Sequence, residues 1–154
     1  MDIIRVQQQP FQAGKEIDAL SQSNKSMGAV VSFIGAMRDI NEGDDVASMT
    51  LEHYPGMTEK ALAKIVADAR DRWVLGQVTL IHRVGMVLPS DAIVLVAVSS
   101  EHRAEAFDAC EFIIDFLKSK APFWKKEITS SGERWVDERS VDNDALEQWD
   151  ENKS

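Results

Sequence analysis

The chain has 154 residues, of which 44% are hydrophobic and 28% charged, a balance typical of a single globular domain. Its formal net charge of −9 argues against non-specific nucleic-acid binding, because phosphate backbones repel an acidic body. The longest apolar run, residues 92–98, is far shorter than the roughly 18 residues that indicate a membrane span. No basic and apolar leader follows Met1, and the single Cys110 cannot form an internal disulfide. We therefore expect a cytoplasmic protein that does not enter a membrane.

The first half of the sequence shows short strand and helix patterns in turn. Strands are indicated by runs of β-branched and aromatic residues, and helices by apolar residues three or four positions apart. Pro55 and Gly56 end one strand, and Thr58 followed by Glu59 is typical of a helix start. The expected elements are a strand over 2–6, a helical stretch over 10–20, a strand over 28–34, a polar loop over 39–45, a strand over 47–54 and a helix over 58–73.

The second half contains the most apolar strand and the longest helix. Residues 78–84 alternate as a strand does, and the nearly continuous apolar run 92–98 predicts a central strand covered on both faces. Residues 99–101 offer a capping hydroxyl and a first-turn acid, so we expect the helix to begin there and to end before Pro122. Strands are expected over 123–128 and 134–136. The apolar side of the helix should carry Phe107, Cys110, Ile113, Ile114 and Leu117.

No internal repeat or long linker divides the chain, so the economical prediction is a single α+β domain with a mixed sheet and a few helices. We place this domain at residues 1–136 and expect residues 137–154 to form an acidic, flexible or partner-dependent tail. Between positions 133 and 151 there are eight acids and only two arginines. Leu146 and Trp149 are the apolar residues with which this tail would dock on a neighbour.

The first candidate site is Ser100-Glu101-His102-Arg103, at the expected start of the long helix. Unpaired backbone N–H groups and the positive end of the helix dipole favour an anion at such a position. Arg103 adds a forked donor suited to phosphate oxygens, and His102 can exchange a proton. A solvated first turn with two ordinary polar side chains is the simpler explanation of the local sequence alone.

The second candidate site is the stretch 118–126, which has four lysines and no acid. A lysine acts as a nucleophile or a base only when neutral, and like charges or desolvation make the neutral form easier to reach. Lys125 and Lys126 face opposite sides of a strand, so one can point into a cleft while the other points to water. The alternative is that the basic residues offset the dipole of a helix C-terminus. That explanation fits Lys118 and Lys120 but not the other two.

The remaining polar residues give weaker signals. Arg38 lies just after a strand, in a loop, where functional side chains are more common than in core strands. His53 and His82 lie in expected strands and are best explained as hydrogen-bonded structural histidines. The histidines lack metal-ligand spacing and Cys110 is best explained as a core residue, so we predict no metal site. No glycine-rich phosphate loop is present.

Four blocks of sequence, taken together, resemble one known family. They are LEHYPGM at 51–57, IHRVG at 81–85, SEHR at 100–103 and KSKAPFWK at 118–125. In this order and at these separations they resemble the large, catalytic subunits of molybdopterin synthase, and the likeness runs from about residue 10 to residue 136. The last block is especially specific.

The resemblance implies an α/β-hammerhead fold and a sulfurtransferase that needs no metal and no cofactor. It implies that the large subunits pair with each other and that each binds a small ubiquitin-like sulfur carrier, giving a heterotetramer. The Gly-Gly tail of the carrier, activated as a thiocarboxylate, would enter a pocket. Two sulfurs would then pass in succession to cyclic pyranopterin monophosphate (precursor Z), forming the dithiolene of molybdopterin.

The resemblance also assigns roles by position. Lys118 corresponds to a lysine beside the terminal glycine of the carrier, and Lys125 to a second lysine needed for the chemistry, so these two are the implied catalytic residues. Many relatives have a lysine at the position of Ala36, so any anion contact there must involve the backbone in this chain. The implied substrate-binding residues are Ala36, Met37, Arg38, His102, Arg103, Lys126 and Glu127.

The charges of the two reactants are consistent with the roles that the resemblance implies. A cyclic phosphate and a thiocarboxylate are both anions, and cationic side chains remove the repulsion between them. The alternative is a non-catalytic, anion-binding adaptor with the same fold. Two convergent lysines argue against an adaptor, which has no use for them. We therefore expect Arg103 and Lys118 to open onto a common pocket, formed within one chain or together with a neighbouring copy.

Overall fold

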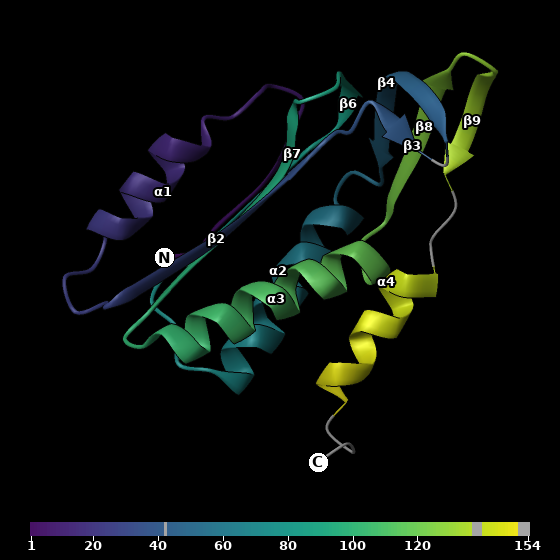
Figure 1. Ribbon diagram of the computed structural model, residues 1–154. Helices are drawn as coiled ribbons and strands as arrows, with labels where there is room; N and C mark the ends of the chain where they lie inside the picture. The colour runs from purple at the N-terminus through teal and green to yellow at the C-terminus, as the bar shows by residue number, and fades with distance from the viewer. Residues whose placement is uncertain (42, 137–139, 151–154) are drawn as a thin grey trace.

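The computed structural model describes residues 1–41, 43–136 and 140–150, and it shows two β-sheets with helices packed around them (Figure 1). The first sheet has the strand order β1-β5-β7-β2. Strand β1 (Ile3–Gln7) runs parallel to β5 (Val78–Arg83), whereas β7 (Ala92–Ser100) is antiparallel to both β5 and β2 (Ala29–Ala36). The sheet is therefore mixed, and the expected α+β domain with a mixed sheet and a few helices is confirmed.

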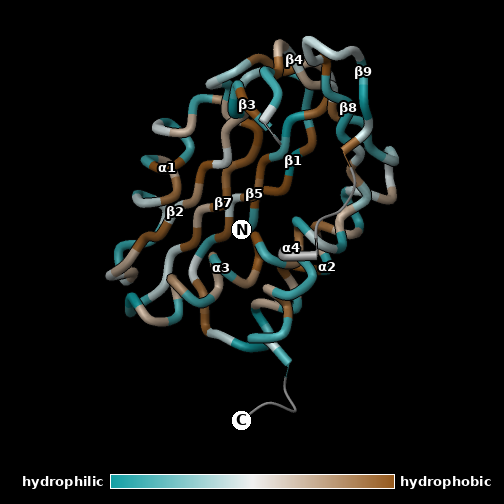
Figure 2. Tube along the Cα trace, turned by 45° about the vertical axis from the view of Figure 1, so that its right-hand side comes forward, coloured by the Kyte–Doolittle hydropathy of each residue, from teal (hydrophilic) through white to brown (hydrophobic). Residues whose placement is uncertain are grey.

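Helices cover both faces of this sheet. Helices α2 (Met57–Arg72) and α3 (Arg103–Lys120) lie on one face, and α1 (Ala13–Gln22) lies on the other (Figure 1). In β7, Val94 and Val96 pack towards α2 and α3, and Leu95 and Ala97 pack towards α1. Figure 2 shows the resulting concentration of hydrophobic residues in β5 and β7. The predicted central strand covered on both faces is confirmed, because alternate residues of β7 belong to different cores.

The second sheet is antiparallel and has the order β3-β4-β8-β9, with β6 paired to the other side of part of β4. Its strands are β3 (Ile40–Asn41), β4 (Asp44–His53), β6 (Gly85–Val87), β8 (Phe123–Thr129) and β9 (Gly132–Val136). The predicted polar loop over 39–45 is wrong in part, since β3 and the start of β4 lie within it. Strands as short as β3 and β6 are stabilised by pairing with β4, and their own residues show no alternating pattern.

Two expectations about the long helix are wrong. Ser99 and Ser100 complete β7, and α3 begins at Arg103, with His102 as an N-cap whose side chain makes no capping hydrogen bond. The Ser100 hydroxyl donates instead to the carbonyl oxygen of Val74, at 3.0 Å. Phe107 is 59% exposed rather than on the apolar side, whereas the predicted burial of Cys110 is confirmed. Among the described residues, no helix is both long and apolar enough to cross a membrane.

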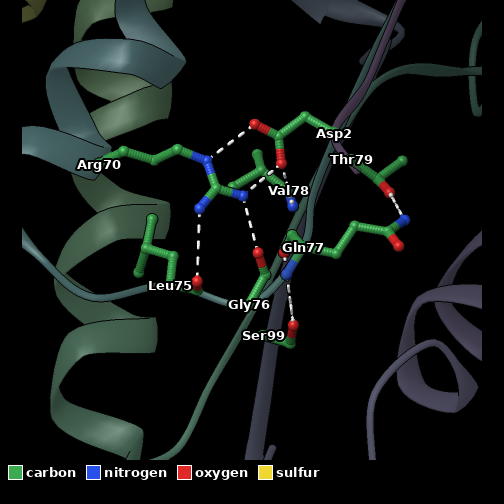
Figure 3. A network of polar contacts seen from close by, with 8 residues as sticks. All are labelled: Asp2, Arg70, Leu75, Gly76, Gln77, Val78, Thr79 and Ser99. Carbon is green, nitrogen blue, oxygen red and sulfur yellow. Dashed lines mark hydrogen bonds and ion pairs between the residues drawn. The ribbon is translucent and has the colours of Figure 1, made fainter.

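The first residues of the chain are fixed to the end of α2 by a network of polar contacts (Figure 3). The Arg70 guanidinium donates to both carboxylate oxygens of Asp2 and to the carbonyl oxygens of Leu75 and Gly76. The Asp2 carboxylate also accepts from the backbone N–H of Val78, at 3.0 Å. Burial raises the pKa of Asp2, but its hydrogen bonds with Arg70 and Val78 outweigh burial and hold that pKa below its usual value. The network joins β1, α2 and β5, and it lies away from the cationic pocket described below.

The described part of the expected tail, residues 140–150, has regular structure and contacts its own chain. It forms α4 (Ser140–Asp144) and the 3₁₀-helix η1 (Ala145–Trp149), and it packs on α3 of the same chain. The Trp149 ring makes edge contacts with Trp73 and Phe112, at centroid distances of 5.6 and 5.5 Å. Its indole N–H donates to Asp115 at 2.8 Å, and Arg72 donates to its carbonyl oxygen at 2.7 Å. Residues 137–139 and 151–154 lie outside the described residues.

We expect Trp149→Ala to lower the free energy of unfolding by about 2 kcal/mol, less than a fully buried tryptophan would cost. The half-buried ring would lose its contacts with two aromatic side chains, and the Asp115 carboxylate would lose a donor. Urea denaturation of the wild type and the variant measures the difference. Equal unfolding midpoints would show that this segment does not stabilise the domain.

Candidate active site

A pocket of about 620 Å³ lies where the end of α3, the start of β8 and the segment after β2 meet. Three cationic side chains line it, those of Arg38, Lys118 and Lys125. Apolar side chains form much of the remaining wall, among them Met37, Met49, Ile93, Phe123 and Trp124. Residues from widely separated stretches of sequence thus form a pocket with three cationic side chains on an acidic protein.

The two lysines enter the pocket from consecutive elements. Lys118 lies in the last turn of α3, and after Ala121 and Pro122 the chain continues as β8. Lys125 is two residues after Phe123 and therefore on the same side of β8. The change from helix to strand around Pro122 thus brings Lys118, which is exposed at the end of α3, and Lys125, which is half-buried on β8, to one cavity.

Arg38 reaches the pocket from the short segment that follows β2. Met37 is buried and fixed by two backbone hydrogen bonds, one to the Asp91 carbonyl oxygen at 3.0 Å and one from the Ser90 N–H at 2.9 Å. The next residue is exposed, so the Arg38 side chain projects at the rim of the pocket. Ala36 and Met37, which the resemblance implies to be substrate-binding residues, line the same cavity.

His102 and Arg103 do not line this pocket. They lie at the first turn of α3, whereas Lys118 lies in its last turn. At 1.5 Å per residue, the two ends are separated by roughly 22 Å along the helix axis. Within a single chain, therefore, Arg103 and Lys118 do not share a cavity.

Lys126 and Glu127 occupy different environments. Lys126 lies on the opposite side of β8 from Lys125, 3.1 Å from the Glu133 carboxylate and above the Trp135 ring at 5.9 Å. Glu127 lines the pocket but is only 5% exposed, and its carboxylate accepts hydrogen bonds from protein donors. Of these two, only Glu127 adjoins the cavity.

A buried histidine lies beneath the lysines. The His82 ring stacks on the Phe123 ring, with centroids 3.8 Å apart and planes 13° from parallel, and its Nδ1 is 2.7 Å from the Arg83 carbonyl oxygen. Burial lowers the pKa of His82 to about 3, and the positive charges of Lys118 and Lys125 act in the same direction. The imidazole is therefore neutral near pH 7. Its contact with the Arg83 carbonyl oxygen confirms the predicted hydrogen bond of this histidine. His53 differs, because its buried Nδ1 has no hydrogen-bond partner among the described residues.

The lowered pKa of His82 predicts a particular dependence of stability on pH. The unfolded chain takes up a proton near pH 6.5, whereas the folded chain resists it down to about pH 3. Stability should therefore fall as the pH is lowered through this window, with a contribution of about 1.4 kcal/mol per pH unit from this group. His82→Phe retains an aromatic ring and should remove that slope. Urea denaturation between pH 7 and pH 4 tests this, and equal slopes for the two proteins would contradict it.

Sequence reasoning missed several residues that shape the pocket. Asn41 lines it from β3, a strand with no sequence signal. Asp142 lines it from α4, and the Ser119 hydroxyl donates to the Asp142 carbonyl oxygen at 2.6 Å. The part of the pocket lined by Asp142 depends on the contacts of α4 with α3, which the local sequence does not indicate.

Neither a metal cluster nor a reactive thiol is found near the lysines in the described part of the chain. No group of three or more His, Cys, Asp or Glu side chains there is arranged to hold a metal ion. Cys110 is buried in the α3 core, where burial raises the pKa of its thiol to about 12. The described lining thus offers three cationic side chains, those of Arg38, Lys118 and Lys125, together with the acidic residues Glu127 and Asp142.

Comparisons with known proteins define the class of this α+β domain. The MoaE protein family matches residues 6–120. The chain is 60% identical over 149 residues to the molybdopterin synthase catalytic subunit of Ralstonia nicotianae, which covers 97% of this chain and 85% of that protein. It is 55% identical over 141 residues to the catalytic subunit of Escherichia coli, covering 92% and 93% of the two chains.

Solved structures agree with the sequence comparisons. The molybdopterin biosynthesis MoaE protein of Burkholderia ambifaria superposes with a TM-score of 0.83 at 52% identity, covering 97% of this chain and 98% of that one. Molybdopterin synthase of Staphylococcus aureus gives a TM-score of 0.81 at 34% identity, covering 87% and 96%. The chain belongs to the MoaE protein family. It is thus an enzyme subunit of the molybdopterin synthase catalytic type, as the sequence resemblance predicted.

Proposed function

We propose that this chain transfers sulfur from the thiocarboxylated C-terminus of a small ubiquitin-like carrier to cyclic pyranopterin monophosphate, forming the dithiolene of molybdopterin. The observation that carries the proposal is the convergence of Arg38, Lys118 and Lys125 on one pocket. Both reactants are anions, and three cations in a partly enclosed cavity offset the repulsion between them.

The three cations would have different tasks. Lys118, at the exposed end of α3, would contact the thiocarboxylate of an incoming tail and polarise it. Lys125, half-buried on β8, would manage protons and stabilise the charge that develops on the phosphate oxygen as the cyclic phosphate opens. Arg38 has the forked donor geometry that suits phosphate oxygens. No step requires a metal or an organic cofactor.

The sulfur would arrive on a partner protein. Cys110 is the only cysteine in the sequence, and it is buried, protonated and outside the described pocket lining. An exposed aromatic pair, Tyr54 and Trp124, lies at the pocket with ring centroids 5.9 Å apart, and Trp124 is part of the lining. We infer that the carrier docks over these rings and inserts its Gly-Gly tail between the lysines. Exposed aromatic residues are enriched at such interfaces.

A second copy of the chain would supply Arg103, which does not line the pocket of its own chain. Strand β2 is the edge of the first sheet, and its Val30, Phe33 and Ile34 side chains are exposed. Antiparallel pairing of two β2 edges would place the start of one strand beside the end of the other, with both copies of α3 on the same face of the joined sheet. The start of β2 is tied to the start of α3, because the Gly28 N–H donates to the Ser100 carbonyl oxygen at 3.0 Å.

Such pairing would carry His102 and Arg103 of one copy towards Arg38 of the other. Arg38 lies just beyond the end of β2, at the pocket. The helix start and its arginine would then hold the pterin phosphate from across the dimer interface. We therefore retain His102 and Arg103 in the proposed substrate site, with the partner copy as the route by which they reach it.

Reconstitution tests the proposed reaction. The purified chain is mixed with thiocarboxylated carrier and precursor Z, and molybdopterin is quantified together with the carrier consumed. We expect product only with the thiocarboxylated carrier, and two carriers used per pterin. The control is the same carrier with an ordinary C-terminal carboxylate. Binding of both reactants without any product would instead favour the non-catalytic adaptor.

A further inference from the structure

We infer that Asn41 and Arg134 are positioning residues of the pterin site, which act through the buried carboxylate of Glu127. They fix the turn that follows Arg38, and Arg134 also cancels a negative charge in the wall of a pocket that must hold anions. The inference rests on the proposed function, because it concerns how the same pocket binds its anionic substrate.

The Glu127 carboxylate is surrounded by hydrogen-bond donors. The Asn41 side-chain N–H₂ lies 3.1 and 3.0 Å from the two carboxylate oxygens, and the Arg134 Nε–H donates to one of them at 3.0 Å. Glu127 is 5% exposed and Asn41 is 8% exposed, and both line the pocket. A buried carboxylate held by these donors has little freedom to move towards a ligand in the pocket. Its contribution to the site must pass through its partners.

The partners of Glu127 also hold β3 and β4 in place. Arg134 also donates to the Asn41 carbonyl oxygen and to the Asp44 carboxylate, each at 2.8 Å. One guanidinium thereby joins β9 to both sides of the β3–β4 turn, while Glu127 joins the turn to β8. Arg38 is three residues before Asn41, and between them the Asp39 carbonyl oxygen accepts from the Val46 N–H at 2.7 Å. The segment after Arg38 is thus held by the Asp39–Val46 backbone hydrogen bond, and Asn41 beyond it is held by the network.

The charge of Glu127 also affects how the pocket binds anions. An uncompensated carboxylate in the pocket wall would repel both a phosphate and a thiocarboxylate, and this repulsion is strong where water is largely excluded. Arg134 places its charge against Glu127 from the side of β9, so the charge of this carboxylate is neutralised from outside the described pocket lining. Loss of Arg134 should therefore weaken substrate binding more than it slows the chemical step.

The test is a charge-rescue cycle in the enzyme assembled with thiocarboxylated carrier. Steady-state kinetics against precursor Z are measured for Arg134→Gln, Glu127→Gln and the double variant. We expect Arg134→Gln to raise KM roughly tenfold while kcat changes less than about threefold. The double variant, which has lost both charges, should recover at least about half of that rise on a logarithmic scale. Asn41→Ala should raise KM by about threefold, because Arg38 is held less firmly.

The matched control is Glu133→Gln, which removes a carboxylate from the same hairpin on the side facing away from the pocket. It should leave both constants unchanged, and thermal unfolding of all the variants separates a loss of fold from a loss of binding. An unchanged KM in Arg134→Gln, or a double variant no better than Arg134→Gln, would overturn the inference. If the wild type makes no molybdopterin in the same assay, it is the proposed function that fails, and the inference fails with it.

Discussion

Replacing Lys118 with alanine should reduce molybdopterin formation by roughly 10²- to 10³-fold, while the fold and carrier binding are retained. Lys118 is exposed at the end of α3, so its side chain contributes little to the core. In the pocket, however, it is the cation nearest the end of the helix and the one assigned to the incoming thiocarboxylate. The loss should therefore appear in kcat with a carrier affinity close to that of the wild type.

Lys120→Ala is the matched control. Lys120 is also exposed in the last turn of α3, carries the same charge and is outside the described pocket lining. If the charge of the helix end were what mattered, the two variants would behave alike. Single-turnover measurements with saturating carrier distinguish the cases. Turnover near the wild-type level in Lys118→Ala would remove this lysine from the mechanism.

Arg103→Ala should also nearly abolish activity, and mixing it with Lys118→Ala should restore part of it. In our proposal, each pocket takes Lys118 from its own chain and Arg103 from the partner. Coexpression of the two inactive variants with random assortment gives heterodimers in half of the population. Each heterodimer then has one complete pocket and one with both defects. We expect about one quarter of the wild-type activity, which neither variant shows alone.

A second mixture controls for non-specific rescue. Lys118 and Lys125 line the same pocket of one chain, so coexpression of Lys118→Ala with Lys125→Ala leaves every pocket of the heterodimer with one defect. That mixture should remain inactive. If the Arg103 and Lys118 mixture also remains inactive although heterodimers form, Arg103 does not act across the interface.

Much of the fold was predictable because its signals are local. The apolar run of β7 and the helical periodicity of α2 are properties of neighbouring residues, so both elements were found close to their observed bounds. The short strands β3 and β6 were missed because they depend on pairing with β4. The start of α3 was misplaced because Ser100, which suits a helix cap, donates instead to Val74 in another part of the chain. These errors arise where the pairing or hydrogen bonding of a segment with another element, and not its own pattern, decides its structure.

The site was predictable in its parts but not in its arrangement. The lysine segment was identified from its sequence block and Arg38 from its place in a loop after a strand, and the structure places all three cations on one pocket. The expected helix already placed Arg103 near its start and Lys118 near its end, but nothing in the sequence indicated how the two would reach one pocket. The role of Glu127 was also hidden, because its partner Asn41 is 86 residues away in the sequence. Arg134 is only seven residues away, but it reaches Glu127 through the β8–β9 hairpin.

The most direct test of the central claim is a crystal structure of the complex with the carrier tail and precursor Z bound. We predict that the terminal carbonyl of the tail lies beside the Lys118 ammonium group. The pterin phosphate should lie between Arg38 of that chain and Arg103 of its partner. A tail that ends outside the pocket, or a phosphate bound away from Arg38 and Lys125, would contradict the claim that cations gathered in one cavity bring two anions together.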